Sequence, residues 1–159
     1  SQHAFRMKEA RLLCAKAKPL LDAGESVLLL GDFNCNSQLD QKWLDARPKN
    51  EEATDEKTAK RRAGNADPDS AVMSQFLALG LIDLVHAQQP TAELQRGTFA
   101  TRLLPQYRTD EQRKDKTWRI DYILADSTLA KRCSSARIPR DKEVDLISDH
   151  YPVEAVFGK

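Results

Sequence analysis

The chain has 159 residues, of which 40% are hydrophobic, and 25 Lys plus Arg stand against 24 Asp plus Glu. This length fits a single domain, residues 1–159, with a sizeable core. The formal net charge of +1 excludes a histone-like polycation that binds nucleic acid by bulk charge alone.

The first predicted elements are a helix and a buried strand. Apolar residues recur at spacings of three and four from Ala4 to Leu21, which predicts an amphipathic helix. Pro19 is expected to kink this helix or to end it early. The next run, Val27 to Leu30, is continuously apolar, which favours a strand covered on both faces.

The middle of the chain contains a charged stretch and a second helix. Residues 42–69 are polar without periodicity, which predicts a long solvated and mobile loop. A short amphipathic helix is expected from Ser70 to Leu79, with Gly80 as its stop signal. Leu81 to Val85 then forms an apolar connection.

The last third of the chain is rich in β-forming residues. Strands are predicted around Thr98 to Leu103, Trp118 to Leu124 and Val153 to Phe157. A second charged loop, 105–117, separates the first two of these strands. Because helices and strands are interspersed, the fold class is α/β or α+β.

Two features of the sequence bear on the cellular location of the protein. No stretch approaches the ~20 consecutive apolar residues of a membrane-spanning helix. The three cysteines are widely spaced and form no C-x-x-C pair, which favours reduced thiols. We therefore expect an intracellular protein, cytoplasmic or nuclear.

Polar residues follow the first predicted strand in the segment Gly31-Asp32-Phe33-Asn34. Residues two apart in an extended chain face the same way, so the Asp32 carboxylate and the Asn34 amide are expected to project together. The same residue types are also typical of a plain turn.

Two further acidic positions lie at predicted strands. Asp121 is surrounded by apolar residues, where an ionised carboxylate is costly unless it is paired or ligates a metal. A salt bridge to Arg119 is one alternative. Asp149 and His150 are adjacent before the last strand, where a buried acid can hold an imidazole in one orientation. An ordinary loop is the alternative there.

In these three segments the sequence resembles the endonuclease/exonuclease/phosphatase superfamily, which includes DNase I, exonuclease-III-like AP endonucleases, retroelement endonucleases and inositol polyphosphate phosphatases. The resemblance implies an α/β fold that is part of a DNase I-like four-layer sandwich, with mixed, mostly antiparallel sheets and flanking helices. It covers most of the chain and corresponds to the C-terminal half of that domain. The matching segments are Gly31-Asp32-Phe33-Asn34, Trp118-Arg119-Ile120-Asp121-Tyr122 and Ser148-Asp149-His150-Tyr151-Pro152, in this order.

The resemblance implies metal-dependent hydrolysis of a phosphodiester by water attack on phosphorus, usually with Mg²⁺ and with Mn²⁺ as a second possibility. By analogy, Asp32 would orient or deprotonate the attacking water and would bind the metal together with Asp149. Asn34 and His150 would contact the phosphate oxygens, and Asp121 would orient His150. Hard carboxylate oxygens suit such a cation, and phosphate oxygens require donors and positive charge.

Nucleic acid is the first expected substrate, because the order of the segments at 77–84, 97–99 and 118–122 is similar to that of AP-endonuclease-like and retroelement nucleases. The loop from Tyr107 to Arg119 supports DNA or RNA, since basic residues outnumber acidic ones and aromatic residues flank them. Trp118 and Arg119 are therefore candidate substrate-binding residues, with packing and a solvated surface as alternatives. The basic residues of this loop are Arg108, Arg113, Lys114, Lys116 and Arg119.

The family's main metal-binding Glu and an early Asn lie in its N-terminal half, which we expect to be missing here and to complete the site in cis. Otherwise another chain completes the site, or the chain is inactive as given. Two competing functions remain. One is a phospholipid or phosphoinositide phosphoesterase of the same superfamily, whose loops would expose apolar residues to a membrane. The other is a catalytically incomplete half-domain that acts only as a binding module.

Overall fold

The computed structural model describes residues 2–45, 70–88, 97–113 and 117–158. Its central sheet has three strands in the order β1-β3-β2. Both pairs are antiparallel, and the register places Asp32 of β1 opposite Asp121 of β3. The bounds are Leu28–Asp32 for β1, Ile82–Asp83 for β2 and Asp121–Ala125 for β3.

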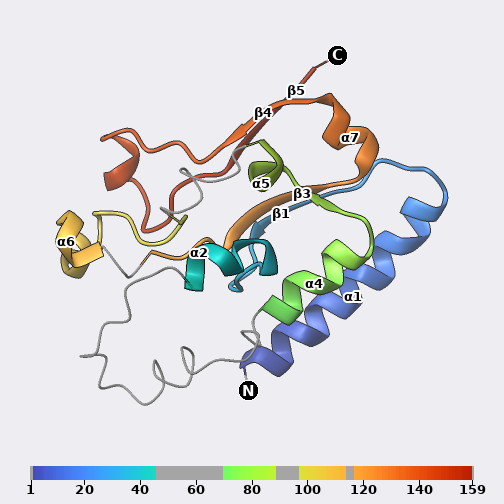
Figure 1. Ribbon diagram of the computed structural model, residues 1–159, viewed down its shortest axis with the longest axis horizontal. Coiled ribbons are helices and arrows are strands. Elements are labelled where there is room, and N and C mark those ends of the chain that lie inside the picture. The colour runs from blue at the N-terminus through green and yellow to red at the C-terminus, as the bar shows by residue number, and fades with distance from the viewer. Residues whose placement is uncertain (1, 46–69, 89–96, 114–116, 159) are drawn as a thin grey trace.

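Two helices cover one face of this sheet. Helix α1, Gln2–Asp22, and helix α4, Ser70–Ala78, lie side by side below the strands (Figure 1). The small residues Ala10 and Ala17 of α1 are buried, and they let the helix approach its neighbours closely. The core of this layer comprises Ala10, Ala17, Val27, Cys35, Val72, Met73, Phe76, Leu81, Tyr122 and Leu124.

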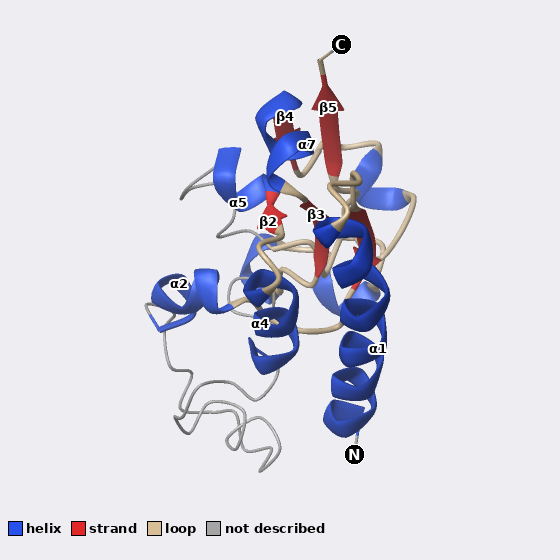
Figure 2. Ribbon diagram, turned by 90° about the vertical axis from the view of Figure 1, so that its right-hand side faces the viewer, coloured by secondary structure: helices blue, strands red, loops and turns tan. Residues whose placement is uncertain are grey.

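A second, two-stranded sheet packs on the other face. Strand β4, Cys133–Arg137, pairs antiparallel with β5, Glu154–Phe157. Helices α5, Leu84–Gln88, and α7, Ser127–Arg132, lie near this sheet in both ribbon views (Figure 2). The hydrophobic core between the two sheets comprises Leu84, Val85, Ile123, Ala125, Cys133, Ala136, Ile138 and Tyr151. The described residues thus form a helix layer, a sheet and a second sheet.

The remaining elements are short. Three are single 3-10 turns and two are helices of four or five residues. They are η1 Gln38–Asp40, α2 Gln41–Asp45, η3 Pro105–Tyr107, α6 Asp110–Arg113 and η4 Val144–Leu146.

The α/β class and the two longest helices are confirmed, and two details near the N-terminus are wrong. Helix α1 does not end early at Pro19 but continues to Asp22, because a proline in the last turn removes only one hydrogen bond close to the helix end. Strand β1 is not covered on both faces within the described residues. Leu28 is 40% exposed and Leu30 is 65% exposed, because the second sheet covers only part of that face.

The strand predictions are met only in part. Strand β5 is confirmed, and regular pairing in the 118–124 segment begins only at Asp121. The segment at 98–103 is not a regular strand, because it forms only isolated bridges, from Phe99 to Trp118 and from Phe99 to His150.

The two predicted charged loops are described in part. Residues 42–45 belong to helix α2, whereas 46–69 lie outside the described residues. The 105–117 segment contains η3 and α6, and its residues 114–116 are not described.

Candidate active site

The candidate site lies where β1 ends and β3 begins, beside the loop that carries His150. Residues directly opposite each other in an antiparallel pair project to the same face, so the register brings the Asp32 and Asp121 carboxylates together. One potential ligand atom from each of Asp32, Asp121 and His150 lies within 4.8 Å of the others. Three positions far apart in the sequence therefore form one cluster.

Asp121 and His150 form the inner part of this cluster. His150 Nδ1 lies 2.9 Å from Asp121 Oδ2, and the two side chains are 25% and 12% exposed, respectively. Burial raises the pKa of Asp121, although hydrogen bonds from Thr98 and His150 act against this rise. An ionised Asp121 accepts the Nδ1–H of His150, which leaves Nε2 as the imidazole atom available to a substrate.

Asp32 and Asn34 form the outer part. Asn34 donates its backbone N–H to Asp32 Oδ1 at 2.7 Å and its side-chain Nδ2 to Asp32 Oδ2 at 3.0 Å. The expectation that these residues continue an extended strand is wrong, because Asn34 has φ 49°, in the left-handed region that Asn tolerates. The carboxylate and the amide still lie together, because the chain turns back on Asp32.

Two buried threonines hold the site loops, and no sequence pattern indicated their role. The Thr98 hydroxyl accepts the backbone N–H of Ile120 at 3.0 Å and that of Asp121 at 3.2 Å. Thr101 holds the loop that carries His150. Its N–H donates to the Asp149 carbonyl at 3.0 Å, and its hydroxyl donates to the Ser148 carbonyl. Both threonines are fully buried.

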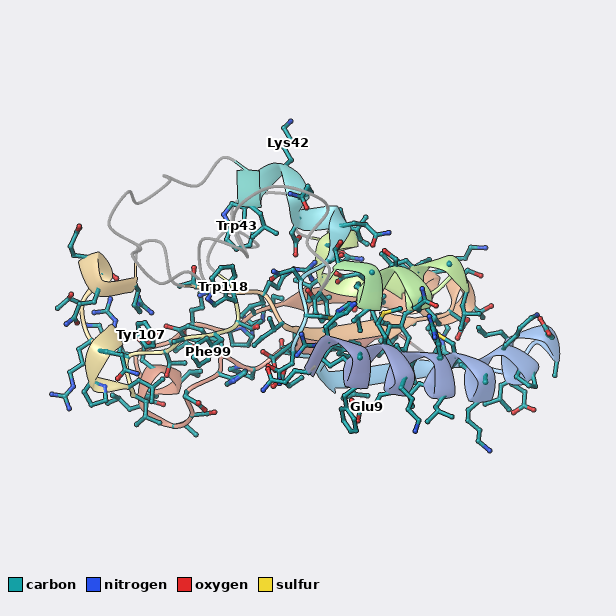
Figure 3. The ribbon with its side chains drawn as sticks, turned by 90° about the horizontal axis from the view of Figure 1, so that it is seen from below. Glu9, Lys42, Trp43, Phe99, Tyr107 and Trp118 are labelled. Atoms are coloured by element: carbon teal, nitrogen blue, oxygen red, sulfur yellow. The ribbon has the colours of Figure 1, made fainter. Side chains whose placement is uncertain are left out.

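The other predicted site residues lie at different distances from the cluster. Asp149 is half-buried, and its carboxylate is not part of the three-residue cluster found among the described residues. Trp118 is half-buried and pairs through its backbone with Phe99. The Phe99 ring lies 5.0 Å from the His150 ring and 6.0 Å from the Tyr107 ring. Figure 3 shows Phe99, Tyr107 and Trp118 together at one end of the molecule.

Arg119 does not reach the site, so we correct its assignment as a substrate contact. Its side chain is 1% exposed, with Nε 2.8 Å from Asp40 Oδ2 and Nη1 2.5 Å from Asp83 Oδ2. Burial opposes the charge, but Asp83, Tyr122 and Asp40 together raise the pKa of Arg119 above its usual value. Arg119 therefore pairs with these two acids, rather than with Asp121 as the alternative interpretation held.

The close approach of Gly97 to Trp118 predicts a large effect of a single methyl group. A Cβ on Gly97 would lie 2.7 Å from the Trp118 backbone, whereas one on Gly24, which has a similar positive φ, would meet nothing within 4 Å. We expect Gly97→Ala to lower the free energy of unfolding by about 1–3 kcal/mol more than Gly24→Ala. Urea unfolding of the two variants measures this difference. Equal losses would mean that only the backbone conformation matters.

Residues 2–150 match the Endonuclease/Exonuclease/phosphatase family. The chain is similar to the exodeoxyribonuclease of Bacillus subtilis strain 168, with 27% identity over 139 residues that cover 87% of this chain and 47% of the relative. The chain therefore spans about half the length of the curated relative it matches.

Solved structures share the fold. The AP endonuclease from Archaeoglobus fulgidus superposes with a TM-score of 0.69 at 21% identity, over 99% of this chain and 55% of that one. The 3'-5' exonuclease NExo from Neisseria meningitidis superposes with a TM-score of 0.60 at 21% identity, over 93% of this chain and 51% of that one. These neighbours place the described layers in a DNase I-like sandwich.

Proposed function

Because the chain belongs to the endonuclease/exonuclease/phosphatase family, we propose that it forms part of a metal-dependent phosphodiesterase, a nuclease that hydrolyses DNA by water attack on phosphorus. The observation that carries this proposal is the cluster of Asp32, Asp121 and His150, whose ligand atoms lie within 4.8 Å of one another. Two carboxylates beside an imidazole supply the acid, base and metal-binding groups that phosphoester hydrolysis requires.

The hydrogen bonds of the cluster suggest a division of roles. Asp32 is exposed, so its carboxylate can orient or deprotonate a water molecule. Asp121 holds Nδ1 of His150 and thereby directs Nε2 toward a phosphate oxygen. The Asn34 amide has two N–H donors. One of them bonds Asp32, which leaves the other for a second phosphate oxygen.

The donor set fits Mg²⁺, with Mn²⁺ as a substitute. Mg²⁺ is held in proteins by one or two carboxylates together with water and substrate phosphate oxygens. We assign this role to Asp32, which belongs to the cluster, and to Asp149, which is assigned from the resemblance and not from the cluster. When bound, the metal neutralises charge on the phosphate and lowers the pKa of a coordinated water.

A DNA substrate is supported by the relatives' names and by the side chains beside the cluster. The half-buried Phe99 ring lies beside His150, and the half-buried Tyr107 ring lies beside Phe99. Each base stacked on such a ring contributes about 1–3 kcal/mol. Trp118 is also half-buried and pairs through its backbone with Phe99. Arg108 is exposed beside Tyr107. Fewer basic side chains are available to DNA than the sequence predicted, because Arg113 and Arg119 form ion pairs within the protein. Lys114 and Lys116 are outside the described residues.

The open side of the central sheet supports the proposal that the remaining half of the family's domain completes the site in cis. Strand β1 is an edge strand within the described residues, and Leu30 on it is 65% exposed. A cavity of about 410 Å³ lies beside it and reaches Asp121 and His150. The lining of this cavity is largely apolar. An additional strand paired with β1 would cover both the open strand edge and this apolar surface. The apolar members of this lining include Leu30, Ile123, Val144, Ile147 and Val153.

A second candidate function is hydrolysis of a phosphoinositide or phospholipid head group. The observation that favours it is the exposure of Leu146 at 67% and Ile147 at 75%, because apolar residues beside a phosphoesterase site can contact a membrane. No described helix is long and apolar enough to cross a membrane. Cys14, Cys35 and Cys133 form no disulfide bond within the described residues, which agrees with the proposed intracellular location.

Metal removal tests the proposed function. We expect the full-length protein to cleave labelled duplex DNA in Mg²⁺, to lose this cleavage in EDTA, and to regain it when Mg²⁺ or Mn²⁺ is added in excess. Parallel assays use single-stranded RNA and phosphoinositide vesicles. Cleavage that persists in EDTA would contradict metal dependence. Hydrolysis of the vesicles without cleavage of DNA would favour the second candidate, and binding of DNA without hydrolysis would favour a binding module.

A further inference from the structure

The segment 102–113 is tied to Tyr151 by a network of arginine, aspartate and tyrosine side chains. Arg113 Nη1 donates to the Tyr151 hydroxyl at 2.6 Å, and that hydroxyl donates to Asp145. Arg102 Nε lies 3.3 Å from the second carboxylate oxygen of Asp145. The network therefore joins three pieces of chain that are separated in sequence.

The inner members of the network are well shielded from water. Tyr151 is 3% exposed, and the Arg113 and Asp145 side chains are each 15% exposed. The Tyr151 hydroxyl donates to Asp145 while it accepts from Arg113. The Arg140 guanidinium lies 4.6 Å from the centre of the Tyr151 ring.

The outer member of the network, Asp110, contributes much less. Its side chain is 80% exposed, and it pairs with Arg102 Nη2 and Arg113 Nη2 at 2.8 Å each. Exposed ion pairs of this kind contribute little to stability. Any functional role therefore belongs to the buried part, in which each hydrogen bond strengthens its neighbour.

Tyr151 connects this network to the candidate site because it directly follows His150. Pro152 restricts Tyr151 to extended backbone, in which consecutive side chains point to opposite sides. His150 contacts Asp121 at 2.9 Å, whereas the Tyr151 side chain reaches the 102–113 segment. The Tyr151 N–H also donates to the Thr98 carbonyl at 2.7 Å. The loop is thus anchored on the side away from Asp121.

We propose that Arg113, Asp145 and Tyr151 are positioning residues that hold His150 against Asp121. This inference rests on the proposed function, because it assigns these side chains a part in that hydrolysis. A displacement of about 1 Å in a catalytic group can cost roughly 100-fold in rate. Because the Tyr151 hydroxyl bonds Arg113 and Asp145 rather than Asp32 or Asp121, we expect the loss of this network to lower kcat while substrate binding is retained.

The first test removes only the hydroxyl of Tyr151. Tyr151→Phe keeps the ring beside Arg140, and we expect kcat for duplex DNA in Mg²⁺ to fall about 10-fold. KM is expected to stay within about twofold, because ground-state binding is unaffected. Asp145→Asn is expected to act in the same direction. The kcat of the double variant, Tyr151→Phe with Asp145→Asn, should fall no further than that of Tyr151→Phe alone, since the effects of residues that act as one unit are not additive.

Matched variants separate positioning from a general loss of stability. Arg137→Gln breaks the exposed 2.8 Å pair with Glu154 on β4 and β5 and is expected to leave kcat unchanged. Arg113→Lys keeps a charged donor and is expected to retain more of kcat than Arg113→Gln.

An unchanged kcat in folded Tyr151→Phe overturns the proposal. If that variant does not fold, an unchanged kcat in both Asp145→Asn and Arg113→Gln overturns it. Absence of metal-dependent cleavage by the wild-type protein overturns the proposed function, and this inference with it.

Discussion

His150→Ala in the full-length protein is expected to lower kcat for DNA cleavage by about 10³-fold or more, because positioned acid-base groups contribute about 10²–10⁴-fold. The imidazole Nδ1 lies 2.9 Å from Asp121 Oδ2. His150 belongs to the same cluster as Asp32. Its removal therefore takes away a phosphate contact and leaves the buried Asp121 carboxylate without this partner. The measurement is steady-state cleavage of labelled duplex DNA in saturating Mg²⁺.

The chain offers a matched control for this change. His86 lies on α5 and is half-buried, and we assign it no part in hydrolysis. His86→Ala is expected to leave kcat unchanged. Circular dichroism of both variants must match that of the wild type. If folded His150→Ala cleaves DNA as fast as His86→Ala, the site assignment is wrong.

Substitutions at the three carboxylates Asp32, Asp149 and Asp121 distinguish the proposed roles within the site. Asp32→Asn and Asp149→Asn are both expected to abolish metal-dependent cleavage, since an amide is a weaker ligand for a hard cation than a carboxylate. Asp121→Asn is expected to lower kcat while the apparent affinity for Mg²⁺ stays unchanged, because Asp121 orients His150. A lowered affinity for Mg²⁺ in Asp121→Asn would instead make Asp121 a metal ligand, which the three-residue cluster also permits.

Local sequence patterns predicted the elements whose formation depends on nearby residues. Helices α1 and α4 follow from apolar spacing, and β5 follows from its β-forming residues after Pro152. Strand β4 was not predicted, because Cys-Ser-Ser-Ala-Arg lacks the β-branched and aromatic residues that indicate strands. It forms through its pairing with β5, which is a contact between distant parts of the chain.

The candidate site was predicted as a set of strand ends, but its geometry depends on long-range pairing. No local pattern states that β1 pairs with β3, yet this pairing places Asp32 opposite Asp121. The role of Thr98 was missed for the same reason, because its hydroxyl accepts N–H groups more than twenty residues away. Arg119 was misassigned because its partners Asp40 and Asp83 are 79 and 36 residues distant.

The buried position of Arg119 leads to the second large prediction. Arg119→Met is expected to lower the free energy of unfolding by about 3–5 kcal/mol, because removal of one partner leaves buried charges uncompensated. Asp40 and Asp83 are 4% and 2% exposed, respectively, so water cannot replace the guanidinium. Urea unfolding measures the loss, and Arg137→Met, which breaks an exposed pair, is expected to cost no more than about 1 kcal/mol.

A combined variant tests the cause of this loss. Adding Asp40→Asn and Asp83→Asn to Arg119→Met removes both uncompensated charges, so we expect part of the lost stability to return. The kinetic readout separates this structural role from substrate contact. Arg119→Met, measured where it is folded, is expected to keep the wild-type KM for DNA. A loss of stability as small as that of Arg137→Met, together with a raised KM, would return Arg119 to the substrate-binding surface.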